Sequence, residues 1–120
     1  HAHAPYSKFQ VGAAVQIRGQ SEAITGCNVE NASFGATVCA ERVALWQARA
    51  RHGAFTPEFV VVVTAEAQAT VPCAQCLQVM AEFCADDMPV YLGNQQGVVR
   101  ELRLKDLLPQ PFRSFVTESK

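Results

Sequence analysis

The cysteines in two short segments place the strongest constraint on the fold of this chain. Cys39 stands two residues before Glu41 in T-V-C-A-E-R, and V-P-C-A-Q-C carries Cys73 and Cys76. The chain has five cysteines, an odd number that cannot pair completely within one chain, and it lacks the cysteine density of small secreted proteins. Reduced thiols in a cytoplasm are the simpler interpretation, and they direct attention to metal binding or catalysis.

The hydrophobic pattern predicts alternating strands and helices. We expect strands at residues 11–17, 23–27, 59–65, 89–92 and 98–102, helices at 38–52, 73–85 and 105–108, a polar loop at 28–34 and a turn at 93–97. Pro72 suits the first position of the second helix, and Gly53 suits the end of the first. This order predicts one mixed sheet with two antiparallel hairpins, parallel right-handed crossovers, and strand 59–65 buried on both faces.

Cys39 and Cys73 both begin predicted helices. Free N–H groups and the helix dipole favour negative charge there and lower the pKa of a thiol. Cys76 lies three residues after Cys73 and faces the same way on the first turn. Two adjacent helices that follow parallel strands would bring their N-termini to one end of the sheet. The three thiolates would then meet.

Zinc suits three thiolates, with tetrahedral coordination and Zn–S distances of about 2.3 Å. Three protein ligands leave a fourth position for water, which is typical of a catalytic site. Glu41 would stand beside this water without binding the metal and would pass its proton to a substrate nitrogen. The pattern C-A-E followed by P-C-A-Q-C matches the signature of zinc-dependent deaminases.

Plainer interpretations of these residues stay open. A single C-x-x-C segment also serves as a redox pair or as half of a structural zinc site. Cys27 and Cys84 are expected to be core thiols, and the three histidines (His1, His3 and His52) are expected to be solvated.

Composition gives no support to a nucleic-acid or membrane partner. The formal net charge is -1, without a basic face. No apolar run approaches the roughly 20 residues of a membrane span. With 49% hydrophobic and 18% charged residues, the chain is expected to form a single domain over residues 1–120, located in the cytoplasm.

The chain resembles the small zinc-dependent cytidine deaminases from residue 4 to about residue 112. The segments that carry the resemblance are APYSKFQVGAAV, TGCNVENASFG, CAERVAL, PCAQCLQVMAEF, MPVYL and LLPQPF. The resemblance implies an α/β protein with the three-layer α-β-α cytidine deaminase-like fold, a mixed five-stranded sheet, one zinc ion per subunit and a homotetramer. The family's N-terminal helix is expected to be largely absent.

The resemblance also implies the reaction, hydrolytic deamination of cytidine and 2′-deoxycytidine to uridine and 2′-deoxyuridine in pyrimidine salvage. Zinc-bound hydroxide would attack C4 of the pyrimidine while Glu41 shuttles protons. Cys39, Cys73 and Cys76 would hold the zinc. Arg42 would donate hydrogen bonds to the thiolates and offset their charge.

Substrate contacts follow from the same resemblance. Phe9 and the Ala40 backbone would contact the pyrimidine, and Asn28 and Glu30 would hydrogen-bond the ribose. Phe112 would reach the site of a neighbouring subunit. Plainer alternatives are core positions for the two phenylalanines and a solvated charge for Glu30. A buried site that bonds sugar hydroxyls would favour a nucleoside over the free base.

Three positions depart from the family pattern. Ala74 replaces glycine and Leu77 replaces arginine in P-C-G-x-C-R-Q, and Phe34 stands where tyrosine is common. The charge missing at Leu77 would alter the electrostatics of the zinc or only a surface contact. Other functions therefore stay open. They are a related aminopyrimidine deaminase acting on a nucleoside antibiotic, a zinc-stabilised binding protein with a silenced site, and a redox protein with a Cys73–Cys76 disulfide.

Overall fold

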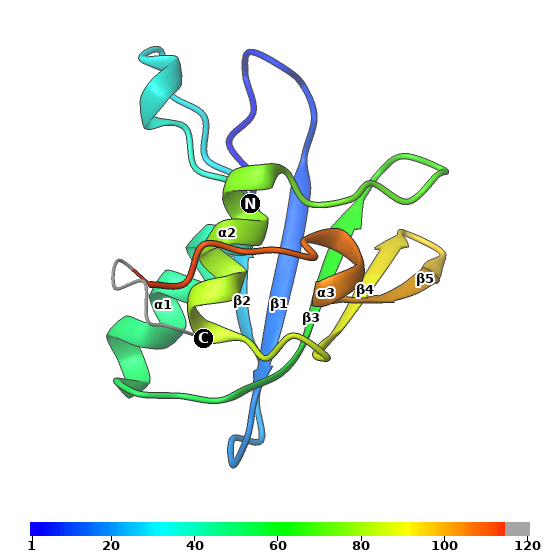
Figure 1. The fold of residues 1–120 in the computed structure, drawn as a ribbon. Coiled ribbons are helices and arrows are strands. Elements are labelled where there is room, and N and C mark those ends of the chain that lie inside the picture. Colours follow the sequence, from blue (N-terminus) through cyan, green and yellow to red (C-terminus); the bar gives the residue numbers. More distant parts are fainter. Residues whose placement is uncertain (115–120) are drawn as a thin grey trace.

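The computed structural model of the chain describes residues 1–114, apart from the side chain of Val99. Within them, strands and helices alternate along the chain (Figure 1). The elements are β1 (Val11–Ile17), β2 (Ile24–Cys27), the short 3-10 helix η1 (Phe34–Ala36), α1 (Ala40–His52), β3 (Pro57–Thr64), α2 (Ala74–Phe83), β4 (Pro89–Asn94), β5 (Gly97–Arg103) and α3 (Leu104–Leu107). In this described part, no helix is long and apolar enough to cross a membrane.

The strands form one mixed sheet in the order β2-β1-β3-β4-β5. β1 pairs antiparallel with β2 and β3, β4 pairs antiparallel with β5, and α2 joins the parallel strands β3 and β4. β2 and β3 also run in the same direction, because each lies antiparallel to the β1 strand between them. The predicted α/β class, mixed five-stranded sheet, antiparallel hairpins and parallel crossovers are confirmed.

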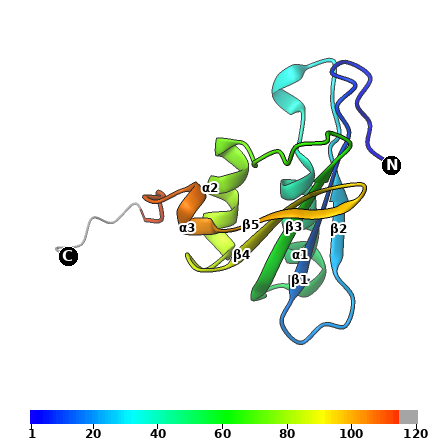
Figure 2. The same ribbon diagram turned by 90° about the vertical axis from the view of Figure 1, so that its right-hand side faces the viewer.

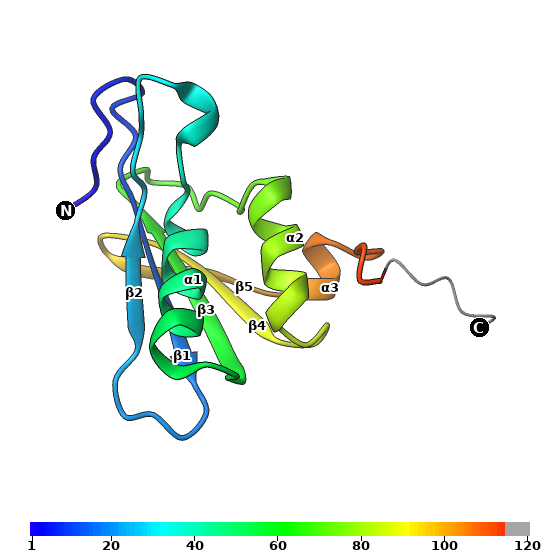
Figure 3. The ribbon, with the colours of Figure 1, turned by 90° about the vertical axis from the view of Figure 1, so that its left-hand side faces the viewer.

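The three described helices pack on one face of the sheet (Figure 2 and Figure 3). Successive side chains of a strand point to opposite faces, and in β3 the buried Val60 and Val62 alternate with half-buried neighbours. The prediction that this strand is buried on both faces is therefore wrong. The described residues do not form a helical layer on the second face, so the expected third layer is not seen in this part of the chain.

α1 and α2 begin at the same edge of the sheet, because each follows one of two strands that run in the same direction. Cys39 and Cys73 are the N-cap residues, so the helices start at Ala40 and Ala74, slightly later than predicted. Pro72 precedes the N-cap, and its predicted place at the first helical position is wrong. The convergence of the two helix starts agrees with the sequence prediction.

Gly26 allows α1 to pack closely on β2. A Cβ atom at this position would lie 2.6 Å from the carbonyl oxygen of Ala40 and 2.6 Å from the backbone nitrogen of Ala44. A larger residue would therefore push the first turn of α1, and the adjacent Cys39, away from the sheet. At its other end α1 stops at Gly53, as predicted, where a φ of 68° suits glycine.

The hairpin of β4 and β5 is longer than predicted. The strands pair as far as Asn94 and Gly97, so the turn is shorter than the expected range 93–97. The Asn94 side chain accepts a hydrogen bond from the Gln96 N–H at 2.9 Å and closes this turn. The last helix starts at Leu104, one residue before the predicted range.

Candidate functional site

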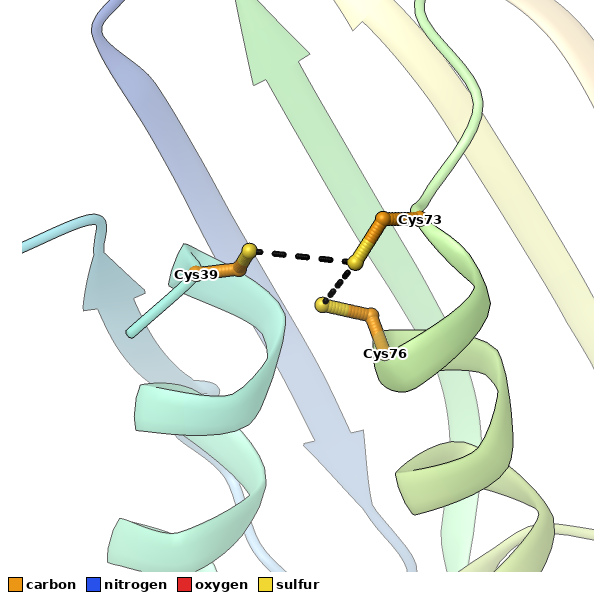
Figure 4. A group of neighbouring side chains, drawn as sticks. All are labelled: Cys39, Cys73 and Cys76. Atoms are coloured by element: carbon orange, nitrogen blue, oxygen red, sulfur yellow. Dashed lines mark hydrogen bonds between the residues drawn. The ribbon is translucent and has the colours of Figure 1, made fainter. Parts of the chain in front are cut away.

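Three sulfur atoms lie together where α1 and α2 begin (Figure 4). The Sγ atoms of Cys39 and Cys73 are 3.9 Å apart, those of Cys73 and Cys76 are 3.5 Å apart, and all three lie within 4.8 Å of one another. Cys76 is fully buried, Cys39 is half-buried and Cys73 is exposed. The predicted convergence of these cysteines is confirmed.

This sulfur cluster fits zinc in its distances and its chemistry. Sulfurs bound tetrahedrally at about 2.3 Å from one zinc ion lie about 3.8 Å from each other, close to the distances of 3.9 and 3.5 Å seen here. Among the described residues no fourth Cys, His or carboxylate joins the cluster, so one coordination position is left for water or substrate.

The redox alternative finds no support in the same distances. A disulfide needs about 2.05 Å between its sulfurs, whereas the Sγ atoms of Cys73 and Cys76 are 3.5 Å apart and all five cysteines are free. Cys84 is the core thiol that was predicted, and burial raises its pKa to about 12. Cys27 is half-buried at the end of β2, away from the cluster.

Hydrogen bonds around Cys39 favour its thiolate. The Cys76 thiol first, and then the Arg42 guanidinium, lower the pKa of Cys39 to about 5. Nη2 of Arg42 lies 3.4 Å from the Cys39 sulfur. The contact with Cys39 and burial raise the pKa of Cys76. Arg42 thus lies where it would offset the charge of the thiolates, a role that stays a prediction.

Glu41 is buried on the first turn of α1, with only 4% of the residue exposed. This burial raises the pKa of its carboxyl group above the usual value, and the negative charge of Cys39 acts in the same direction. A carboxyl group with a raised pKa exchanges protons closer to neutral pH, which suits general acid–base catalysis.

A cavity of about 290 Å³ opens beside the sulfur cluster, near the lower end of the range of about 300–1,000 Å³ for small-molecule sites. Its lining includes the predicted site residues Phe9, Asn28, Glu30, Ala40 and Glu41, together with the ligands Cys39 and Cys73. A larger open hollow of about 510 Å³ is lined by Gly12 and Val63, among others, and by none of the three cysteines of the sulfur cluster.

Asn28 has a structural role that the sequence did not reveal. It is only 8% exposed. Its Oδ1 accepts a hydrogen bond from the Val11 N–H at 2.9 Å, and its Nδ2 donates to the Phe9 carbonyl at 2.8 Å. The Asn28 side chain thus fixes the backbone that carries Phe9 into the cavity. One amide hydrogen and one lone pair are left for the predicted sugar contact.

Phe112 lies outside the cavity, with 58% of the residue exposed. Gln78 of α2 holds its backbone, because Oε1 accepts a hydrogen bond from the Phe112 N–H at 3.2 Å and Nε2 donates to the Phe112 carbonyl at 2.5 Å. The alternative of a core position therefore fails for Phe112 in the described chain. Its predicted contact with a neighbouring subunit's site stays a prediction.

The departures from the family pattern have different structural settings. Leu77 is 7% exposed and belongs to the hydrophobic core, so this departure alters core packing rather than a surface contact. Ala74 is exposed at the start of α2. Phe34 is 73% exposed and packs edge-on against Tyr6, with ring centroids 5.6 Å apart.

Some cavity residues were missed by the sequence analysis, among them Ser7, Thr37, Thr64 and Val71. Thr37 and Val71 each stand two residues before a ligand cysteine, and this proximity was a usable signal. Ser7 and Thr64 carried no such signal in the sequence. The path of the N-terminal segment brings Ser7 to the cavity, and the pairing of β1 with β3 brings Thr64 there.

Sequence comparisons agree with the geometry of this site. The pattern of the cytidine and deoxycytidylate deaminase zinc-binding region matches residues 1–92. A cytidine deaminase of Halalkalibacterium halodurans is 47% identical over 111 residues, which cover 92% of this chain and 83% of the relative. A cytidine deaminase of Sporosarcina psychrophila is 41% identical over 111 residues, which cover 92% of this chain and 80% of that relative.

Solved structures lead to the same conclusion. The crystal structure of cytidine deaminase from Burkholderia pseudomallei matches with a TM-score of 0.82 and 44% identity, covering 92% of this chain and 87% of the other. That of the Mycobacterium tuberculosis enzyme matches with a TM-score of 0.79 and 35% identity, covering 92% and 85%. Cys39, Cys73 and Cys76 are the zinc ligands. The chain belongs to the family of zinc-binding cytidine and deoxycytidylate deaminases, within the small cytidine deaminases that use three cysteine ligands.

Proposed function

We propose that this protein hydrolyses cytidine and 2′-deoxycytidine to uridine and 2′-deoxyuridine with release of ammonia. One observation carries the proposal: buried Glu41 lies beside the sulfur cluster in a cavity that Asn28 and Glu30 also line. The relatives from Halalkalibacterium halodurans and Sporosarcina psychrophila are both cytidine deaminases, which supports the same reaction.

Zinc held by the three cysteines supplies a Lewis acid that brings the pKa of a bound water toward neutrality. Glu41 accepts the proton of the attacking water and delivers it to N3 of the pyrimidine. It then takes the proton of the new C4 hydroxyl and delivers it to the amino group, so that C4 becomes a carbonyl and ammonia leaves. Burial raises the pKa of Glu41, which brings the exchange of its proton closer to neutral pH and suits a group that both accepts and donates.

Arg42 compensates the charge of the ligands. Three thiolates on a divalent cation leave a net negative charge, which opposes ionisation of water. Arg42 donates a hydrogen bond to Cys39 at 3.4 Å and brings a guanidinium to the cluster. Its Nε is buried and has no hydrogen-bond partner among the described residues, and its guanidinium also lies over the Trp46 ring, 5.9 Å from the ring centroid.

Other residues that line the cavity bind the nucleoside. Phe9 contacts the pyrimidine ring, and the backbone of Ala40 contacts its polar edge. Asn28 and Glu30 offer a donor and acceptors to the sugar hydroxyls, which favours a nucleoside over free cytosine.

The charges of the cavity favour a nucleoside over a nucleotide. Its described lining contains no Lys, Arg or His, and its charged carboxyl groups belong to Glu30 and Glu41. The hydroxyl of Ser7 lowers the pKa of Glu30, which is therefore ionised. A phosphate would be repelled by this carboxylate and would meet no cationic side chain in the described lining. We therefore assign nucleosides rather than deoxycytidylate, which the family also includes.

We also propose a homotetramer that works in the cytoplasm. The exposed ring of Phe112, on a backbone fixed by Gln78, supports a contact with the site of a neighbouring subunit. The five free cysteines support a reducing compartment. Sedimentation equilibrium of the zinc-loaded protein measures the assembly, and a monomer at enzyme-assay concentrations would contradict it.

The test of the reaction is the ultraviolet absorbance of substrate mixed with zinc-loaded protein, with ammonia measured in parallel. Cytidine, 2′-deoxycytidine, cytidine 5′-monophosphate and cytosine are compared. We expect turnover of the two nucleosides and a kcat/KM at least about tenfold lower for the other two. No turnover of either nucleoside by a protein with stoichiometric zinc would refute the reaction. Equal turnover of the monophosphate would refute the charge argument.

A further inference from the structure

The N-terminal segment at residues 3–11, here called the N-terminal strap, is attached to the segment that carries Glu30. The His3 N–H donates to the Asn28 carbonyl at 3.0 Å, and the Glu30 N–H donates to the His3 carbonyl at 2.8 Å. These bonds place the strap beside the cavity, at the upper end of the sheet in Figure 1. The strap can therefore control side chains that face the substrate.

The carboxylate of Glu30 turns back onto this strap. Its Oε1 accepts hydrogen bonds from the backbone N–H groups of Tyr6 at 2.9 Å and Ser7 at 3.1 Å. Its Oε2 accepts a hydrogen bond from the Ser7 hydroxyl. Because Oε1 already has two donors, Oε2 is the oxygen with a lone pair left for a sugar hydroxyl.

The direction of the Ser7 hydroxyl is fixed from its other side. The Phe9 N–H donates to Ser7 Oγ at 3.0 Å and occupies one lone pair of that oxygen. The single hydroxyl proton is then directed at Oε2 of Glu30. Ser7 and Glu30 both line the cavity, and Ser7 is not in contact with the sulfur cluster.

We propose that Ser7 is a positioning residue that orients the Glu30 carboxylate toward the secondary hydroxyls of the substrate sugar. The inference rests on the proposed function. Without the Ser7 hydroxyl, Oε2 would lose the bond that directs it, and the carboxylate would rotate about the two backbone bonds that still hold Oε1. Substrate binding would weaken, whereas the chemical step at the sulfur cluster would continue.

The test compares Ser7→Ala with the unchanged protein, both loaded with zinc, on cytidine and on 2′,3′-dideoxycytidine. We expect the KM for cytidine to rise about tenfold, as for loss of one hydrogen bond to a charged group, while kcat changes less than about twofold. For the dideoxy substrate the KM should change less than about twofold, because it offers Glu30 no secondary hydroxyl.

Two further variants separate positioning from a general structural effect. In a Glu30→Ala background, adding Ser7→Ala should raise KM less than about twofold, because the partner is already absent. Ser21→Ala removes a hydroxyl from the turn between β1 and β2 and should change neither constant. Zinc content and Tm are measured for every variant, and both should match their parent proteins.

Two results would overturn the inference. One is a KM increase that is equal for cytidine and its dideoxy analogue. The other is a KM increase that persists in the Glu30→Ala background, which would mean that Ser7 acts without Glu30, by binding the sugar directly or through its bond to the Phe9 N–H. If the unchanged protein turns over no cytidine, the proposed function fails instead. Calorimetric binding of uridine and 2′,3′-dideoxyuridine then decides the inference, which requires Ser7→Ala to weaken uridine binding selectively.

Discussion

The two halves of the cavity are built in different ways. The metal half consists of the three cysteines and Glu41, which come from two short segments at the starts of α1 and α2. The sugar half consists of Asn28 and Glu30, held by hydrogen bonds to residues 17 to 24 positions away in the sequence. The pattern of ligands within each of these two segments is therefore local, and sheet pairing brings the two segments together. The sugar half depends on how distant segments pack even for its individual side chains.

This difference predicts which kinetic constant each half controls. Groups in the metal half act on the reacting atoms, so their loss should reduce kcat. Groups in the sugar half act on binding, so their loss should raise KM. The four predictions below test that division, from the largest expected effect to the smallest.

The largest effect is expected for Cys73→Ala. Removal of one of three thiolates should abolish stoichiometric zinc binding and turnover, and should lower Tm, because metal binding is coupled to folding. Metal analysis, activity and thermal denaturation measure these effects. Cys84→Ala is the control thiol variant, since Cys84 is buried away from the cluster and should keep its zinc. Full zinc content in Cys73→Ala would contradict the ligand assignment.

Glu41→Gln should lower kcat by about 10²–10⁴-fold, because an amide cannot accept and return the proton. Zinc content and the KM for cytidine should stay close to those of the unchanged protein. The measurement is steady-state kinetics on protein of known zinc content. If the variant keeps its kcat, Glu41 has no part in the mechanism. If the variant loses zinc, Glu41 belongs to the metal site.

Asn28→Ala should affect both binding and stability. It removes two hydrogen bonds from a position that is 8% exposed, which costs about 2 kcal/mol of unfolding free energy. We expect the KM for cytidine to rise about tenfold, since the backbone at Phe9 is released. Urea denaturation and kinetics measure the two effects. Asn31→Ala, in an exposed loop, should change the unfolding free energy and the KM for cytidine far less. A fall in kcat with unchanged KM would contradict the proposal that the sugar half controls KM and the metal half controls kcat.

The smallest effect concerns pH. The Ser7 hydroxyl lowers the pKa of Glu30 from the usual 4.5. The stabilising contact of the carboxylate is therefore present above that usual value and is lost only as the pH falls through the lowered pKa. Between about pH 8 and about pH 5.5, the contribution of Glu30 to KM should change less than about twofold. The ratio of the KM of Glu30→Gln to the KM of the unchanged protein measures the contribution of Glu30. A ratio that falls steadily below pH 7 would show that Glu30 is protonated there.

The sequence by itself determined the metal half of the site and the order of the elements. A cysteine–x–glutamate segment and a C-x-x-C segment, each at the start of a helix predicted to follow one of two parallel strands, indicated that three thiolates and Glu41 lie together. Local spacing carries this information because helix starts and the rise of a helix are fixed by the backbone. Strands 11–17 and 59–65 were also recognisable, because apolar residues of strand length follow a simple pattern.

Only the tertiary structure decided how the sugar half is assembled. Ser7, Asn28 and Glu30 meet through hydrogen bonds that sequence spacing does not encode, because they depend on the strap lying beside the segment that carries Glu30. It also decided that Leu77 packs in the core, and that one face of β3 is only half-buried. These three features have the same physical cause, because burial and long-range hydrogen bonds depend on which elements become neighbours. The spacing of the ligands within each segment depends instead on the geometry of single helix turns.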